Sequence, residues 1–173
     1  MRRTILVVIL LVVLGAVVGF NWGLPRLPVP EPSILYDING QEIQSLTPNS
    51  LTQVDLDEIS DYVEMAFIAT EDRNFYSHFG IDLKAILRAT WVNIKNRRIT
   101  EGGSTITQQT AKNLYLSHER TFVRKIKELF YTLALERRYS KDEILTMYLN
   151  SIYFGQGATG IDAAARTYFG KPA

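Results

Sequence analysis

The sequence predicts a mainly helical domain that follows a single N-terminal membrane anchor. Three observations lead to this prediction: an uncharged apolar run near the N-terminus, a proline-rich stretch after it, and apolar residues at helical spacing through most of the remainder. The 173 residues suffice for one domain with an appendage, and 46% hydrophobic with 21% charged residues is typical of a folded protein. A net charge of +1 gives no reason to expect nucleic acid as a partner, and the absence of cysteine excludes disulfides and thiolate metal sites.

The N-terminal run has the features of a membrane anchor. Two arginines precede 16 uncharged residues that begin at Ile5, close to the roughly 17–25 residues that cross a bilayer. Trp22 follows, where a tryptophan suits the membrane interface. A cleaved secretory signal is the alternative, but no clear small-residue cleavage site follows the run. We therefore predict a cytoplasmic tail at residues 1–3 and a retained transmembrane anchor at residues 4–22, with the rest of the chain outside the cytoplasm.

A stiff linker and a β-hairpin are predicted next. Residues 23–33 contain four prolines in eleven positions, which excludes a helix and favours an extended spacer. Two short strand-like runs then flank Asn39 and Gly40, a dipeptide that strongly favours a hairpin. The folded domain is predicted to occupy residues 34–173.

From residue 55 onward, apolar residues recur every three or four positions, which predicts helices. The helices are expected within residues 56–72, 82–96, 101–113, 121–138, 140–154 and 160–170. Ser140 suits an N-cap. We expect the apolar stripes of these helices to be buried in the core. The stripe residues are Ile59, Tyr62, Val63, Ala66, Phe67, Leu83, Ile86, Leu87, Thr90, Trp91, Ile94, Phe122, Ile126, Leu129, Phe130 and Leu133.

The first candidate functional stretch is ATEDRNFYSHFG, residues 69–80, in which Glu71 and Asp72 precede a cluster of aromatic residues. Contact with aromatic rings would desolvate a carboxyl group and raise its pKa toward neutrality, which suits a proton-transfer group. A solvated turn that happens to carry acids is the alternative. His78 is a candidate base, although a histidine in an aromatic turn more often has a structural role.

A second candidate is a positively charged stripe on the helix expected over residues 121–138. From Lys112 to Lys141 there are eight Lys or Arg and three Asp or Glu, and several of them recur at helical spacing. The residues on this face are Arg120, Arg124, Lys127, Glu128 and Tyr131. Such cations can hold a phosphate or diphosphate. Glu128 would either form a surface pair with Arg124, worth less than ~1 kcal/mol, or help hold a divalent cation or orient a leaving group.

The third candidate is a glycine-rich loop that opens a helix. Two adjacent glycines permit tight turns, and neutral hydrogen-bonding side chains follow at the helix N-terminus. These side chains are Ser104, Thr105, Gln108 and Gln109. Such groups suit sugar hydroxyls, and a flexible loop with a polar cap is the alternative.

Taken together, these segments resemble the peptidoglycan glycosyltransferases, the transglycosylase domain of class A penicillin-binding proteins and of monofunctional membrane-bound transglycosylases. Five motifs occur in the family's order: EDRNFYSHFG, GGSTITQQTAKN, RKIKE, KDEILTMYLN and ARTYFGK. The resemblance covers about residues 34–173. It implies a lysozyme-like, mainly helical fold with a small membrane-associated lobe. It also implies polymerisation of lipid II, an undecaprenyl-diphosphate disaccharide-peptide, into β-1,4-linked glycan on the outer face of the bacterial cytoplasmic membrane.

The resemblance further implies roles for single residues. Glu71 would take the proton from the acceptor 4-hydroxyl, while Glu128 would assist the diphosphate leaving group, directly or through Mg²⁺ or Mn²⁺. The diphosphate would be neutralised by Lys112, Arg120, Arg124 and Lys127. The sugar cleft would be lined by Ser104, Thr105, Gln108 and Gln109. Mainly structural roles would fall to Asp72, Phe75 and His78. Cell-wall synthesis proteins would be further partners.

Two departures from the family pattern are visible. Thr146 stands where the family commonly has glutamate, and the chain ends before the helical lobe of the family is complete, so a C-terminally incomplete domain is expected. No SxxK serine motif of a transpeptidase occurs. One alternative is an inactive membrane-anchored fragment or paralogue that binds lipid II or cell-wall synthesis partners. A lytic enzyme is a weaker alternative, because a neutral glycosidic bond needs no cationic stripe.

Overall fold

The computed structural model of the chain describes residues 24–25, 33–46, 53–116, 119 and 121–173. The predicted cytoplasmic tail, the predicted anchor and most of the predicted linker therefore lie outside the described residues. No helix in the described part of the chain is both long and apolar enough to cross a bilayer.

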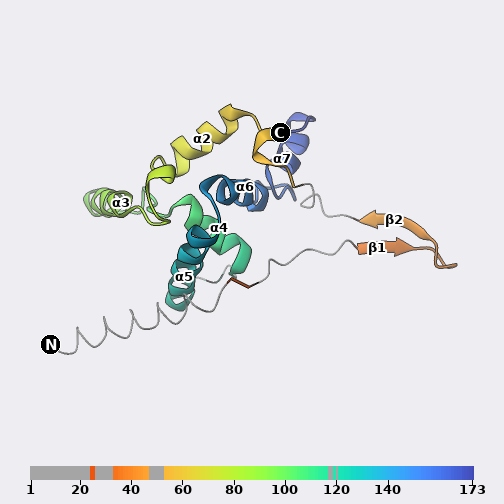
Figure 1. The fold of residues 1–173 in the computed structure, drawn as a ribbon, viewed down its shortest axis with the longest axis horizontal. Helices are drawn as coiled ribbons and strands as arrows, with labels where there is room; N and C mark the ends of the chain where they lie inside the picture. Colours follow the sequence, from red (N-terminus) through yellow and green to blue (C-terminus); the bar gives the residue numbers. More distant parts are fainter. Residues whose placement is uncertain (1–23, 26–32, 47–52, 117–118, 120) are drawn as a thin grey trace.

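The hairpin predicted around Asn39 and Gly40 is confirmed. Strand β1 (Ser33–Tyr36) pairs antiparallel with β2 (Glu42–Leu46), and the two strands stand apart from the helices (Figure 1). In the turn, the Asp37 carbonyl accepts from the Gly40 amide at 3.0 Å, while one Asp37 carboxylate oxygen accepts from the Asn39 and Gln41 amides at 2.8 and 2.7 Å. Gly40 has a φ of +78°, a conformation that glycine adopts without strain.

The helical body follows the order predicted from the apolar spacing. Its elements are the 3₁₀ turn η2 (Leu56–Glu58), α2 (Asp61–Glu71), the 3₁₀ turn η3 (Phe75–Ser77), α3 (Leu83–Asn96), α4 (Ile106–Tyr115), α5 (Phe122–Arg138), α6 (Lys141–Ser151) and α7 (Ile161–Phe169). The expected N-cap is confirmed, since the Ser140 side chain accepts from the Glu143 amide. The segment 56–72 is divided, because Ile59 is extended and α2 begins only after Ser60.

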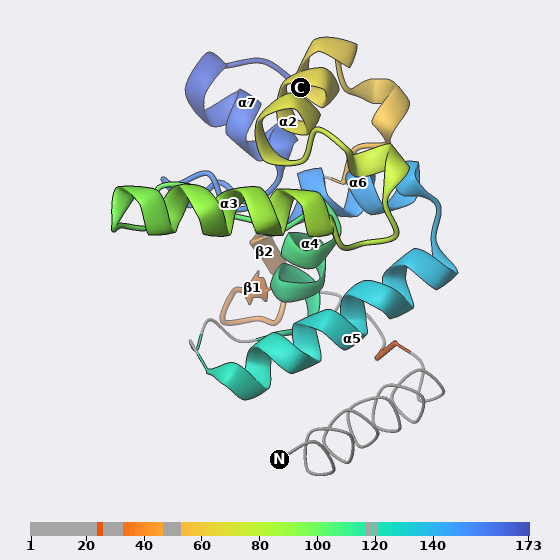
Figure 2. The ribbon, with the colours of Figure 1, turned by 90° about the vertical axis from the view of Figure 1, so that its left-hand side faces the viewer.

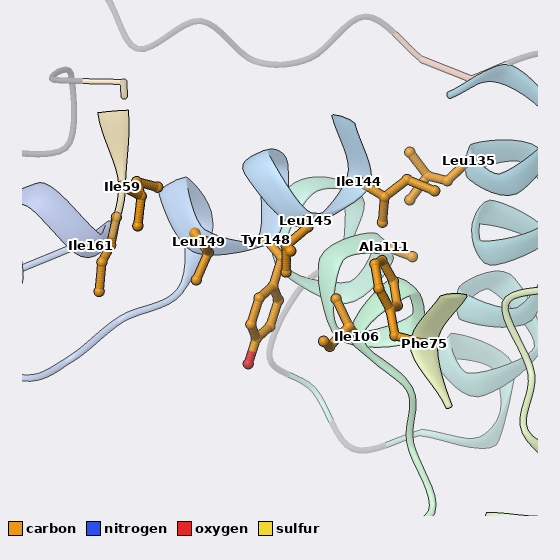
Figure 3. Packing of buried hydrophobic residues seen from close by; sticks show 10 residues of the cluster. All are labelled: Ile59, Phe75, Ile106, Ala111, Leu135, Ile144, Leu145, Tyr148, Leu149 and Ile161. Carbon is orange, nitrogen blue, oxygen red and sulfur yellow. The ribbon is translucent and has the colours of Figure 1, made fainter. Parts of the chain in front are cut away.

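The core is centred on α4 and α6. Helix α4 packs against both α5 and α6, and in Figure 2 α3 and α5 lie on either side of it. Apolar side chains from these helices, from η3 and from the segments around them meet in one cluster (Figure 3). The cluster consists of Ile59, Phe75, Ile106, Ala111, Leu135, Ile144, Leu145, Tyr148, Leu149 and Ile161.

The prediction for the buried face of α5 is wrong. Phe122 is 81% exposed, and Ile126 and Leu129 are exposed as well, whereas the buried residues of α5 are Glu128, Thr132 and Leu135. The physical reason is that α5 packs on α4 through the face that carries these three residues. Phe122, Ile126 and Leu129 of the predicted stripe therefore lie on the surface, while Phe130 and Leu133 are half-buried.

The apolar stripe of α3 is also exposed, which contradicts the prediction that it lies in the core. Trp91 and Leu87 are each 70% exposed, and Leu83 and Ile94 are similar. In α3, which the structure describes in full, Ala89 is the one buried residue. The predicted stripe of α2 is wrong at Tyr62, which is 81% exposed, and at Ala66, which is exposed as well. Helical spacing detects an apolar face, but it does not show what covers that face.

Asn150 fastens the chain segment before the helices onto α6. Its side-chain oxygen accepts from the Val54 amide at 3.1 Å, and its side-chain nitrogen donates to the Val54 carbonyl at 2.9 Å. Thr146, the departure noted in this motif, donates its hydroxyl to the Asp142 carbonyl of its own helix at 2.9 Å. The threonine is thus accommodated by an ordinary intrahelical hydrogen bond.

Candidate functional site

Glu71 is the last residue of α2, and its side chain is exposed at the edge of a cavity. Its Oε2 atom accepts a hydrogen bond from Nε2 of Gln109 in α4 at 2.8 Å. The cavity has a volume of about 460 Å³ and is lined mainly by polar residues from the end of α2, the start of α3 and the loop before α4. A carboxylate held in this way is oriented by a neutral donor and remains open to a ligand.

The aromatic cluster predicted to surround Glu71 surrounds its neighbour instead. Asp72 is buried, and Nε2 of His78 lies 3.0 and 2.9 Å from its two carboxylate oxygens. The Phe75 ring packs edge-on against the His78 ring. The burial expected for Glu71 is therefore wrong, because the turn after α2 directs Asp72 inward and leaves Glu71 outside.

Asp72 also joins the first motif to the second. Its Oδ2 atom accepts from the backbone amide of Ile106, the first residue of α4, at 3.0 Å. A carboxylate at a helix N-terminus satisfies a free amide and is favoured by the helix dipole. Because α4 also carries Gln109, this contact helps to fix the donor that holds Glu71.

An apolar wall lies on the other side of Glu71. Ala66, Phe67 and Thr70 form a small hollow with it. Phe67 packs edge-on against Tyr148 and Phe154, with centroid distances of 6.0 Å. Burial raises the pKa of Tyr148 well above its usual value, and the negative charge of nearby Glu71 adds to this rise. The phenol of Tyr148 therefore stays protonated and can donate a hydrogen bond.

The polar residues at the start of α4 have two different environments. Thr105 is buried, accepts from the Gln108 amide at 3.1 Å, and donates to the Gly80 carbonyl at 2.7 Å. Gln108 is also buried and completes the capping box by accepting from the Thr105 amide. Ser104 is exposed at the cavity, and Gln109 reaches Glu71. A direct contact with a sugar is thus most accessible to Ser104 and Gln109, and it stays a prediction.

The cationic stripe of α5 has a buried carboxylate at its centre. Glu128 is only 3% exposed, so it is not the solvated surface residue of the first interpretation. The expected pair with Arg124 is present, with Nη1 of Arg124 2.8 Å from Oε2 of Glu128. Lys125 pairs with the other oxygen, Oε1. Lys125 is not among the cations predicted from the sequence, although its position three residues before Glu128 is a helical neighbour spacing.

The remaining cations of the predicted stripe differ in exposure. Lys127 is exposed on α5, and Lys112 is half-buried on α4, one turn after Gln109. Arg120 lies outside the described residues. In the part of the chain that the structure describes, no ion pair joins Glu71 to these cations. The structure therefore shows two separate groups: Glu71 of α2 beside the polar cavity, and the cationic cluster on α5. Helix α4 contacts both, through the hydrogen bond from Gln109 to Glu71 and through its packing against α5.

Within the described residues, side chains alone do not gather into a site for the predicted Mg²⁺ or Mn²⁺. No three His, Asp or Glu side chains gather at one point among the described residues. Both oxygens of Glu128 already carry cationic partners, Arg124 and Lys125. Carboxylate oxygens are the ligands that such ions prefer, so a metal ion here would take most of its ligands from a bound substrate. Metal dependence stays a prediction.

Comparison with known proteins shows the class to which this fold and site belong. A family model described as "Transglycosylase" matches residues 39–173, which include both glutamates, the glycine-rich loop and every described helix and 3₁₀ turn from η2 to α7. The chain belongs to the transglycosylase family.

Individual relatives agree with this membership. The chain is 51% identical over 142 residues to "Penicillin-binding protein 1A" of Aquifex aeolicus, which is 82% of this chain and 20% of that protein. It is 47% identical over 180 residues to "Penicillin-binding protein 1A/1B" of Bacillus subtilis, which is 98% of this chain and 20% of the relative. It is 50% identical over 122 residues to "Monofunctional glycosyltransferase" of Staphylococcus haemolyticus, which is 70% of this chain and 45% of the relative. The chain thus spans less than half the length of each of these relatives.

Proposed function

We propose that the chain is a peptidoglycan glycosyltransferase that polymerises lipid II into β-1,4-linked glycan and releases undecaprenyl diphosphate. The observation that carries the proposal is Glu71, an exposed carboxylate held by Gln109 at the edge of a polar cavity. Family membership and the relative named as a monofunctional glycosyltransferase support it.

In the proposed reaction, Glu71 accepts the proton of the acceptor 4-hydroxyl as that oxygen attacks the anomeric carbon of the growing chain. The new carbon–oxygen bond forms while the bond to the diphosphate breaks, and the diphosphate leaves with the electron pair. The hydrogen bond from Gln109 fixes one oxygen of Glu71, so the other stays available to the acceptor. Positioning of this kind can supply a large part of the rate enhancement.

The cations on α4 and α5 suit the leaving group. A diphosphate develops negative charge as it departs, and fixed cations stabilise that charge. We assign this role to Lys112, Arg124 and Lys127, as expected from the family, and we add Lys125. Glu128 holds Arg124 and Lys125 in place through its two oxygens. Because Glu128 is buried between cations, its contribution in this proposal is to orient them.

We further propose that the exposed faces of α3 and α5 meet the membrane that contains the substrate lipid. Trp91 and Leu87 on α3, and Phe122 on α5, are large apolar side chains with more than two thirds of their surface exposed. The end of α3 and the loop after it add Lys95, Arg97 and Arg98, three basic residues near this apolar stripe. An apolar helix face beside basic residues suits a bilayer with anionic headgroups. The predicted anchor at residues 4–22 would keep this surface close to the bilayer.

The proposed function is tested by lipid II polymerisation with the Glu71→Gln variant. Glutamine retains the shape of the side chain and can still accept from Gln109, but it cannot take up a proton. We expect glycan ladders on a gel from the wild-type chain in detergent, and a loss of at least about 100-fold in rate for the variant. Asp61→Asn, which neutralises an exposed carboxylate at the other end of α2, is the matched control and should retain activity.

Two results would contradict the proposal. If Glu71→Gln made glycan at the wild-type rate, the proton acceptor would lie elsewhere. If the wild-type chain bound lipid II without making glycan, the chain would be a binding module, the alternative considered from the sequence. Far-UV circular dichroism of each variant shows whether any loss of activity comes from unfolding.

A further inference from the structure

One asparagine of α3 holds the loop that leads to the cavity. Oδ1 of Asn93 accepts from the amides of Thr100 and Glu101 at 2.7 and 3.0 Å, and from the Thr100 hydroxyl at 3.2 Å. Its Nδ2 donates to the Glu101 carbonyl at 2.9 Å. A single half-buried side chain thus makes four hydrogen bonds to two consecutive loop residues.

The same residue takes part in the turn that sends the loop back along α3. The Asn93 carbonyl accepts from the Arg98 amide at 3.2 Å, and Arg97 adopts the left-handed conformation with a φ of +51°. This arrangement ends the helix and reverses the chain. The side chain of Asn93 then binds the loop at Thr100, two residues after Arg98.

Beyond Asn93 the loop lies directly on α3. Gly103 is so close to Ile86 that a Cβ atom added to it would lie 3.1 Å from the Ile86 Cα atom. Arg88 and Glu101 form a longer, solvent-exposed pair at 3.4 Å, which adds little stability. The loop residues from Glu101 to Thr105 line the cavity that also contains Glu71. Asn93 is therefore the main polar attachment of one cavity wall.

We propose that Asn93 is a positioning residue that sets the shape of the substrate cavity by holding the loop at residues 99–104. This inference rests on the proposed function. A loop with two adjacent glycines has many accessible conformations, and the four hydrogen bonds of Asn93 select one of them. In this proposal the loop contacts the substrate but takes no part in making or breaking bonds. Asn93 should therefore affect the affinity for the substrate more than the rate of the chemical step.

The test uses the full chain with Asn93→Leu, which keeps the size of the side chain and removes all four hydrogen bonds. Asn93→Asp keeps the acceptor oxygen for the two amides and loses the donor, so it should have an intermediate effect. Asn96→Leu is the matched control, because the Asn96 amide in the same helix makes one hydrogen bond to the loop, at 3.2 Å. The measurements are KM and kcat for lipid II, the Kd of lipid II, and amide exchange of the loop.

For Asn93→Leu we expect KM and Kd for lipid II to rise roughly tenfold, with kcat reduced by less than about threefold. Amide exchange should accelerate at residues 99–104 while the rest of the helical body is unchanged. A fall in kcat at constant KM and Kd would overturn the proposal, as would exchange that accelerates throughout the domain. If the wild-type chain binds lipid II but makes no glycan, the proposed function fails, while Kd and amide exchange still decide the role of Asn93.

Discussion

Glu136 shows how single residues join three helices and a turn behind the site. Its carboxylate oxygen accepts from the Thr107 hydroxyl of α4 at 2.5 Å and from the Lys141 ammonium of α6 at 2.7 Å. The Lys141 ammonium also lies 4.6 Å from the centre of the Phe75 ring. The Glu136 side chain is 4% exposed, so its charge depends on these partners for compensation.

We expect Lys141→Met to lower the free energy of unfolding by about 2–3 kcal/mol, because it leaves the Glu136 carboxylate buried without its cation. Urea denaturation followed by circular dichroism measures the change. Lys95→Met, at an exposed lysine of α3, is the control and should change stability by less than about 0.5 kcal/mol. Adding Glu136→Gln to Lys141→Met should restore part of the loss, and an equal effect of both lysine variants would contradict the argument.

For single residues, the sequence predicts which side chains are functional better than it predicts which partners they contact. The motifs predict Glu71 and Glu128 as functional acids, and the Arg124–Glu128 pair follows from helical spacing alone. The hydrogen bond from Gln109 to Glu71 spans 38 residues, so no local pattern could predict it. The inward direction of Asp72 was missed for a similar reason, since it depends on the distant amide of Ile106.

Gly80 shows how closely the first motif packs against α5. It is buried with a φ of +75°, and a Cβ atom added to it would lie 2.7 Å from Cγ2 of Thr132 and 2.9 Å from Cγ of Glu136. Its carbonyl also accepts from the Thr105 hydroxyl at the start of α4. Glycine is therefore required here by the backbone conformation and by the available space.

Gly80→Ala should lower the free energy of unfolding by about 2–4 kcal/mol, since left-handed backbone strain and overpacking against α5 act together. Thermal and urea unfolding of the purified chain measure the effect. Gly102→Ala is the matched control: its added Cβ meets no atom within 4 Å, and stability should change by less than about 0.5 kcal/mol. A change of similar size at both glycines would show that packing at Gly80 is looser than described.

The elements themselves were largely predictable, whereas their orientation was not. Helix starts depend on short-range caps, such as Ser140 and Thr105, which the sequence displays directly. The burial of a helix face depends on what packs against it, and α4 accepts the Thr132 face of α5 instead of the apolar Phe122 face. Apolar spacing has the same appearance whether the stripe faces a core or a lipid phase.

Apolar side chains of two helices, α3 and α5, lie on the surface of the described structure, as the proposed membrane contact requires. A large exposed apolar surface on a water-soluble domain usually marks an interaction site. The α3 stripe is well suited to an experimental test, because Trp91 is one of only two tryptophans in the chain.

In vesicles of phosphatidylethanolamine and phosphatidylglycerol, Trp91 should be in contact with lipid. Replacement of the other tryptophan by Trp22→Phe leaves Trp91 as the single reporter. We expect a blue-shifted emission that is quenched by brominated acyl chains and protected from iodide. Substitution of Lys95 and Arg98 by glutamine should weaken the effect, because fewer charges attract the anionic lipid. Unchanged iodide quenching after reconstitution would contradict the proposed membrane contact.

The attachment of Val54 to Asn150 determines which helix would bear a mechanical force applied to the N-terminal part of the chain. Both polar atoms of the Val54 backbone are bonded to this one side chain of α6, a helix that contributes Leu145, Tyr148 and Leu149 to the core. Tension that enters from the direction of the hairpin would thus be transmitted to a helix that forms part of the hydrophobic core. Glu71 is the last residue of α2 and lies farther along the chain than Val54. A force applied to the N-terminal part of the chain would therefore reach α6 before it reached the carboxylate of Glu71.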